Sequence, residues 1–148
     1  MIMRLTGHSM EFLCGERLAG SYCYTDPFKC YLHPLNTPEG YTVSLRSPED
    51  HRHHKGLFYG LRTQRVIFWE EYSTRPGETV GQQLHTKFTS TVFEGDTVGF
   101  AENLAWKSRR WVAAFLGTAR HPLRDGRRPV YVDLAFRSAG STRSHAHD

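Results

Sequence analysis

The chain has 148 residues, of which 39% are hydrophobic and 13% aromatic. It is long enough for one domain with a buried core and too apolar for a disordered protein. The mean hydropathy is −0.54, and no apolar run approaches 18 residues, which excludes a transmembrane helix. The first residues include Glu11 and Glu16 and lack the apolar core of a signal peptide. We therefore expect a cytoplasmic protein without a membrane partner.

The net charge of +4 is unevenly distributed. Residues 1–106 hold ten Lys/Arg against twelve Asp/Glu, whereas residues 107–148 hold nine against three. The basic residues of the last third lack the helical or motif context of a nucleic-acid module, so no nucleic-acid partner is predicted. Cys14, Cys23 and Cys30 are odd in number and lack CxxC spacing, which predicts buried free thiols. Cys23 and Cys30 could nevertheless face each other across a turn.

Short β-prone runs fill the first half of the chain. They predict strands at 18–24, 28–32, 41–45 and 65–73. Asp26-Pro27, His33-Pro34 and the turn-rich segment 36–40 separate the first three.

The clearest pattern is a long hairpin. Val80–Phe93 and Thr97–Trp106 alternate in polarity, and the segment 94–96 provides the turn. The expected inward positions are Val80, Leu84, Phe88 and Val92 on the first strand, and Val98, Phe100, Leu104 and Trp106 on the second, with Glu102 as the polar member of that face.

The last third is less regular. Trp111–Leu116 fits either a strand or a helical turn, Asp125-Gly126 is a turn signal, and Pro129–Arg137 alternates again. Residues 138–148 are polar, which predicts a disordered tail. Without repeats or a linker, the pattern predicts one all-β domain over residues 1–137, an antiparallel β-sandwich.

Three histidines, His51, His53 and His54, lie in the stretch 47–61, which we expect to be a loop. An H-x-H pair is the start of a cupin-type metal site, and His33 or His85 with Asp50, Glu70 or Glu71 could complete it. The glycine and glutamate that usually flank such a pair are missing, and Lys55 opposes a cation. We therefore expect no metal and no cofactor, with a metal-dependent cupin-like enzyme as the alternative.

General acid/base chemistry is the second possibility. His53 or His54, paired with Asp50 or Glu70, could move a proton to or from a sugar oxygen. The aromatic residues Phe58, Tyr59 and Trp69 could pack on the apolar face of a sugar ring. The chain contains no nucleophile-elbow, zinc-protease, P-loop or dinucleotide-binding motif.

Several short motifs resemble a known family. They occur in chain order from about residue 18 to residue 108: His33-Pro34-Leu35, Thr37-Pro38-Glu39-Gly40, Pro48-x-Asp50-His51-x-His53-His54-Lys55-Gly56-Leu57, Phe68-Trp69, Gly81-Gln82-x-x-His85 and, more loosely, Gly95-Asp96 and Leu104-x-Trp106. The set resembles the bacterial family called methane oxygenase PmoA-like, a DUF6807-type domain. Its D-H-x-H-H-[KR]-G core is the most specific part.

The resemblance implies a β-sandwich similar to part of the galactose mutarotase-like supersandwich, and a link to carbohydrate metabolism. The methane monooxygenase subunit behind the family's name is a membrane protein, so methane oxidation is not expected here. Family members are usually about twice as long, so this chain resembles their N-terminal half. Mutarotase relatives also use a carboxylate from a late part of the chain that is absent here.

Together these observations predict a carbohydrate-binding or carbohydrate-modifying domain with a histidine-lined pocket, such as an epimerase or another proton-transfer enzyme. The predicted catalytic residues are His53, His54 and His85. The predicted substrate-binding residues are His33, Asp50, His51, Lys55, Trp69 and Glu70, with Arg52 as a further contact to hydroxyls or a carboxylate. The expected partner is a small carbohydrate, and a second copy of the chain would cover open sheet edges. A non-catalytic or inactive fragment is the remaining alternative.

Overall fold

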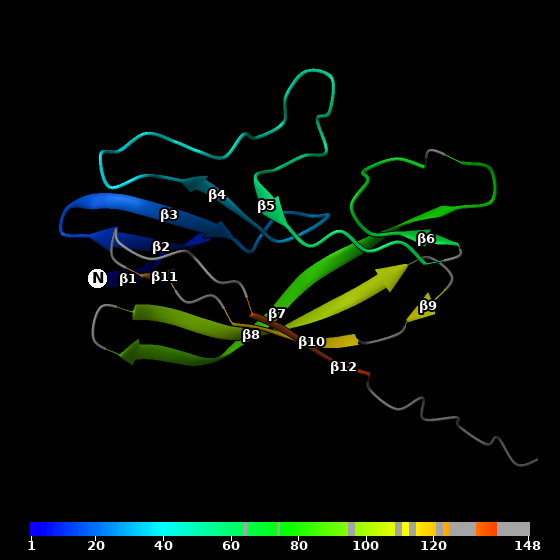
Figure 1. Ribbon diagram of the computed structural model, residues 1–148. Helices are drawn as coiled ribbons and strands as arrows, with labels where there is room; N and C mark the ends of the chain where they lie inside the picture. Colours follow the sequence, from blue (N-terminus) through cyan, green and yellow to red (C-terminus); the bar gives the residue numbers. More distant parts are fainter. Residues whose placement is uncertain are drawn as a thin grey trace, which may run out of the picture.

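A computed structural model describes residues 1–63, 65–73, 75–94, 97–108, 111–112, 115–120, 123–124 and 133–138. These residues form two β-sheets stacked in two layers (Figure 1). The described residues contain no helix, and therefore none that could span a membrane. The predicted all-β sandwich is thus confirmed.

The first sheet contains five strands in sequential order: β1 (Ile2–Leu5), β2 (Ser9–Cys14), β3 (Arg17–Cys23), β4 (Tyr31–Leu35) and β5 (Leu57–Phe58). All neighbours are antiparallel. Gly15, with a φ of 61°, lies in the tight turn between β2 and β3.

The second sheet is built on the predicted long hairpin, and its strand order is β12-β10-β8-β7-β6. Among the strand pairs that the structure describes here, β6 with β7 is parallel and the others are antiparallel. Short strands β9 and β11 also pair with β8. The strands are β6 (Val66–Ile67), β7 (Thr79–Glu94), β8 (Thr97–Ser108), β9 (Trp111–Val112), β10 (Phe115–Arg120), β11 (Leu123–Arg124) and β12 (Asp133–Ser138).

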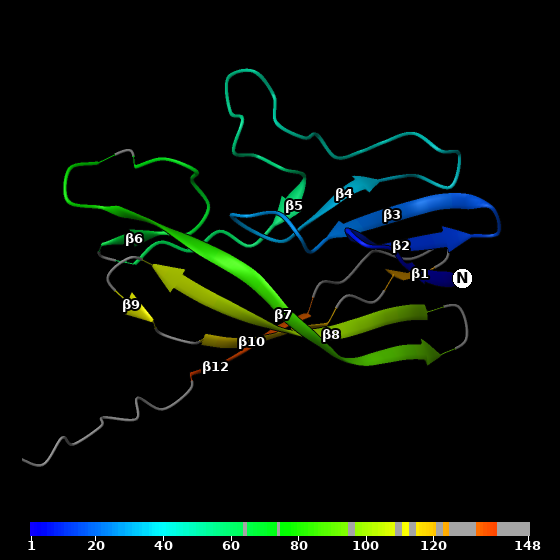
Figure 2. The same ribbon diagram turned by 180° about the vertical axis from the view of Figure 1, so that it is seen from behind.

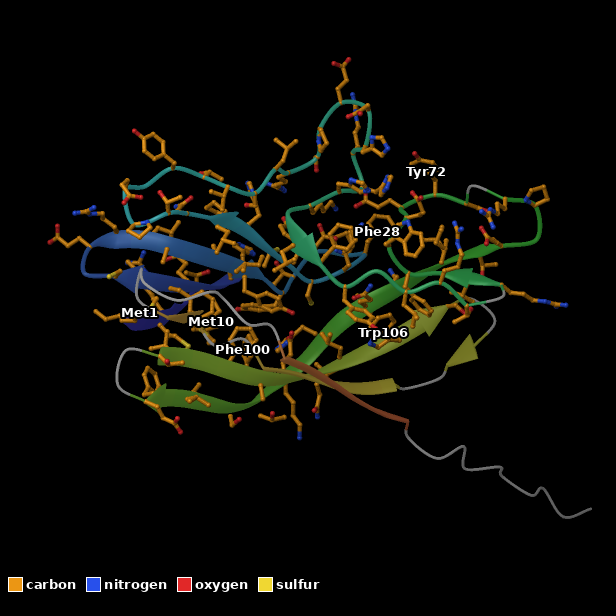
Figure 3. The ribbon with its side chains drawn as sticks, viewed as in Figure 1. Met1, Met10, Phe28, Tyr72, Phe100 and Trp106 are labelled. Atoms are coloured by element: carbon orange, nitrogen blue, oxygen red, sulfur yellow. The ribbon has the colours of Figure 1, made fainter. Side chains whose placement is uncertain are left out.

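The core lies between the two layers. Met10, Phe12 and Tyr22 from the first sheet meet Phe100 and Trp106 from the second. Figure 3 shows Met10, Phe100 and Trp106 between the layers. The inward face predicted for β8 is correct, because Val98, Phe100, Leu104 and Trp106 are all buried, together with Glu102.

The inward face predicted for the first half of β7 is wrong. Gly81 and Gln83 are buried there in place of Val80 and Leu84. The Gln83 amide donates to the carbonyls of Tyr59, at 2.6 Å, and Phe68, at 2.8 Å, so a polar side chain is satisfied inside the protein. A register shift between His85 and Lys87 then changes which side chains face inward, and Phe88 packs against the core.

Several predicted strands are shorter or displaced. The strand predicted at 28–32 is Tyr31–Leu35, because Asp26 Oδ1 accepts hydrogen bonds from the N–H groups of Phe28 and Lys29 and holds a turn there. The segment 41–45 makes one isolated bridge, from Thr42 to Asn36, and 65–73 keeps only Val66–Ile67 as a strand. Trp111 begins a strand rather than a helical turn.

The cysteines follow the prediction in part. All three are free, and Cys30 is buried, but Cys23 is only half-buried and Cys14 is exposed at the end of β2. The predicted turn residues Gly95, Asp96, Asp125 and Gly126 and the tail 139–148 lie outside the described residues.

Candidate functional site

The histidines lie in a loop between β4 and β5, as predicted. In both views this loop rises from the first sheet on the side away from β8 (Figures 1 and 2). Its base is closed by backbone hydrogen bonds from Ser47 to His54, at 2.5 Å, and from Gly56 to Leu45, at 2.8 Å. Gly56, with a φ of 77°, passes so close to β4 that an added Cβ would lie 2.4 Å from the Leu32 carbonyl oxygen. Only glycine fits this position, and the loop's attachment depends on it.

The three imidazoles lie against one another. The ring centroids of His53 and His54 are 4.4 Å apart, and the His51 and His54 rings stack at 4.9 Å. His51 Nδ1 lies 2.9 Å from Asp50 Oδ2, and the hydrogen bond from His51 holds the pKa of Asp50 below its ordinary value. His51, His53, His54 and Asp50 therefore form one group, which we call the histidine cluster.

His53 is the buried member of the cluster and has a carboxylate partner. Its Nδ1 lies 3.2 Å from Glu70 Oε2, and the two side chains are 7% and 10% exposed. Glu70 also accepts a hydrogen bond from Trp69 Nε1 at 3.1 Å. Burial lowers the pKa of His53, although the charge of Glu70 opposes this shift, so neutral imidazole is favoured near neutral pH.

Lys55 is held inside the protein. Its Nζ lies 2.7 Å from Asp26 Oδ2 and also pairs with Glu71 Oε1. Burial alone would lower the pKa of Lys55, but these two hydrogen-bonded partners outweigh it and raise the pKa. Burial likewise opposes ionisation of Asp26, but the hydrogen bond from Lys55 and those from two backbone N–H groups hold its pKa below the ordinary value. Lys55 thus has structural ion-pair partners and is not an exposed ligand for a substrate.

A second lysine supports the same network. The Lys29 side chain is fully buried, donates to the Trp69 carbonyl oxygen, and lies 3.9 Å from Glu71 Oε1. Its ammonium also lies 4.7 Å from the Phe58 ring centroid. Burial lowers its pKa to about 8. Glu71 therefore connects the segment that carries Glu70 both to Lys29 and to Lys55, which lies in the loop that carries His53.

His85 belongs to a different centre, between the two sheets. Its Nδ1 lies 2.6 Å from Glu102 Oε2, and the other carboxylate oxygen of Glu102 accepts a hydrogen bond from Tyr22. The His85 ring packs on Tyr24 and Phe88. Among the described residues, these partners are distinct from those of the histidine cluster. The structure therefore does not bring His85 to His53 and His54.

His33 also lies apart from the cluster. Its Nδ1 lies 2.9 Å from Ser44 Oγ, which also accepts the backbone N–H of Leu35. Burial, followed by the charge of Arg46, lowers the pKa of His33. The side chain thus ties the segment 41–46 to β4, which is a structural role.

Among the aromatic residues, Phe58 and Tyr72 have ring contacts with the cluster, with the Phe58 centroid 6.0 Å from that of His54. The guanidinium of Arg62 lies 4.9 Å from the Trp69 ring centroid, and Gly60 packs against the same ring. Tyr72 is 58% exposed, and its ring centroid lies 6.2 Å from that of His53. Figure 3 shows Tyr72 on the loop side of the molecule, far from Phe100 in the core.

Sequence reasoning missed Tyr72, Lys29 and Asp26 as parts of this site. Tyr72 follows the Glu70-Glu71 pair directly, which was the one available signal. Asp26 was interpreted only as part of a chain break, and nothing local predicts that Lys29 is buried. Within the described residues, no three His, Cys, Asp or Glu side chains are arranged to hold a metal ion.

The fold and this site define an all-β sandwich domain with a histidine-rich loop braced by buried ion pairs. The chain matches the model of a family of unknown function, DUF6807, over residues 9–133, and it belongs to that family. Neither a curated protein nor a solved structure matches it.

Proposed function

We propose that this domain binds or chemically modifies a sugar or sugar derivative at the histidine cluster, in the cytoplasm, as a PmoA-like member of the galactose mutarotase-like superfamily. The observation that carries the proposal is the His53–Glu70 pair beneath two more imidazoles and the exposed ring of Tyr72. Imidazole nitrogens can donate to and accept from hydroxyl groups, and a tyrosine ring can pack on the apolar face of a pyranose.

The chemistry that suits this arrangement is proton transfer. The charge of Glu70 lies beside the His53 imidazole, which could take a proton from a sugar hydroxyl or from a carbon next to a carbonyl group. His54, in contact with the His53 ring, is placed to return a proton as the general acid. An epimerase or a mutarotase would need this pair of roles.

The experiment is a screen of sugars by ligand-observed NMR and thermal shift, followed by anomer-resolved NMR to follow interconversion. We expect at least one sugar to bind, with affinity at least tenfold weaker in His53→Ala. His8→Ala, which alters an exposed histidine in the turn before β2, is the matched control and leaves binding unchanged. Folded protein that binds no sugar contradicts the proposal. Binding without interconversion would support a binding module rather than an enzyme.

A further inference from the structure

The lysines that could attract an acidic sugar are already paired. Lys55 is bound to Asp26 and Glu71, and Lys29 is fully buried with its Nζ on the Trp69 carbonyl and near Glu71. We propose that the ligand of the histidine cluster is a neutral sugar, and that the site discriminates against the corresponding sugar acid. This inference rests on the proposed function and specifies its substrate class.

The balance of charge around the cluster is negative. The buried network holds two lysines against three carboxylates, from Asp26, Glu70 and Glu71. The loop between β4 and β5 adds three exposed carboxylates against two exposed cations: Glu39, Glu49 and Asp50 against Arg46 and Arg52. The carboxylates, lysines and arginines of the network and the loop together number six negative and four positive charges.

The carboxylate nearest to His53 is sheltered from water. Glu70 is only 10% exposed, and its Oε2 lies 3.2 Å from Nδ1 of His53. A ligand carboxylate brought to His53 would meet this charge across a poorly screened space, whereas a neutral sugar would not be repelled by it. Like-charge repulsion is how a binding site rejects a ligand that otherwise has the right shape.

The test compares matched pairs: glucose with glucuronate, and galactose with galacturonate, titrated at pH 7.5 by NMR or calorimetry. At about 20 mM ionic strength, we expect the neutral member to bind at least tenfold more tightly. The ratio of the affinity for the neutral sugar to that for the acid should decrease in about 0.5 M NaCl, because salt screens the repulsion. Glu71→Gln removes one of the two carboxylates that pair with Lys55. This variant should also reduce the ratio of the two affinities. Glu16→Gln, the same charge change at an exposed turn residue, should not.

The outcomes separate this inference from the proposed function. Equal or tighter binding of the acid, lost in His53→Ala, overturns the neutral-sugar inference and leaves the proposed function standing. A preference for the neutral sugar that is unaffected by Glu71→Gln or by salt overturns the electrostatic argument. No binding by any of the four sugars, with the fold intact, contradicts both.

Discussion

Glu70 Oε2 lies 3.2 Å from Nδ1 of His53, and both side chains are at least nine-tenths buried. The two residues come from different loops, one before β5 and one after β6. Burial lowers the pKa of His53 and the charge of Glu70 raises it, and burial is the larger effect. The pKa of His53 therefore reports on its burial and on its contact with Glu70.

We expect the pKa of His53 to lie below the ordinary value of 6.5 and to fall further in Glu70→Gln, because the variant removes the charge that favours imidazolium. The imidazole resonances can be followed by NMR as a function of pH. Glu16→Gln should leave this pKa unchanged. A pKa of His53 above 6.5, or one unaffected by Glu70→Gln, would show that the pair does not form in solution.

Lys55→Met should lower the free energy of unfolding by about 3 kcal/mol, because it leaves Asp26 and Glu71 without their cation in a poorly solvated place. Urea denaturation monitored by tryptophan fluorescence provides the measurement. Lys87→Met removes an exposed lysine of β7 and should change stability by less than about 0.5 kcal/mol. If the two variants lost the same stability, Lys55 would be solvated rather than paired.

Lys29 makes the free energy of unfolding depend on pH in the alkaline range. Burial lowers its pKa from 10.5 to about 8, so the unfolded chain binds more protons than the folded one between these values. The contribution of Lys29 to the free energy of unfolding therefore increases as the pH rises from about 8 to about 10.5, by up to about 3 kcal/mol.

Lys29→Met removes this dependence. We expect the stability of wild type relative to Lys29→Met to increase between pH 7.5 and pH 10, as measured by urea denaturation at each pH. A difference that stays constant over this range would mean that Lys29 titrates normally.

Glu102 makes the free energy of unfolding decrease as the pH rises from the acid range, which is the opposite of the effect of Lys29. Burial raises its pKa above 4.5, although hydrogen bonds with Tyr22 and His85 oppose the shift. The folded protein therefore keeps this proton to higher pH than the unfolded chain, and the resulting stability is fully present below pH 4.5 and is lost as the pH rises through the folded pKa.

Glu102→Gln does not titrate at this position. It should therefore gain stability relative to wild type between pH 4.5 and pH 8, measured by denaturant titration. Glu94→Gln, at the exposed end of β7, is the control and should show no such trend. A trend of the opposite sign would mean that His85 and Tyr22 stabilise the carboxylate more than burial disfavours it.

Gly56→Ala should destabilise the protein by more than about 3 kcal/mol and loosen the histidine cluster. Its added Cβ would lie 2.4 Å from the Leu32 carbonyl oxygen and 2.8 Å from His33 Cβ, at a φ of 77°. Gly40→Ala also has a positive φ, of 95°, but an open surrounding, so it should cost only about 1–2 kcal/mol. Thermal unfolding of the two variants measures the stability that each one loses relative to wild type. Equal losses would assign the whole effect to φ rather than to the contact with β4.

The sequence alone determined the fold class and the position of the histidine loop. Alternating side chains over β8 predicted its buried face, including Glu102, because strand periodicity is a local property of the backbone. Asp26-Pro27 likewise predicted the end of β3, but the break predicted at His33-Pro34 is wrong, because both residues lie inside β4. The start of β4 is also displaced, because Asp26 caps a turn at Phe28 and Lys29.

Only the tertiary structure decided which histidines share a site. His53 meets Glu70, whereas His85 meets Glu102 and Tyr22 between the sheets, and His33 meets Ser44. Residue type could not separate these roles, because any of these histidines could have bound a ligand, and their partners are set by sheet stacking over long sequence distances. Lys55 shows the same limit: its charge was evident, but its burial against Asp26 and Glu71 depends on three segments that meet only in the folded chain.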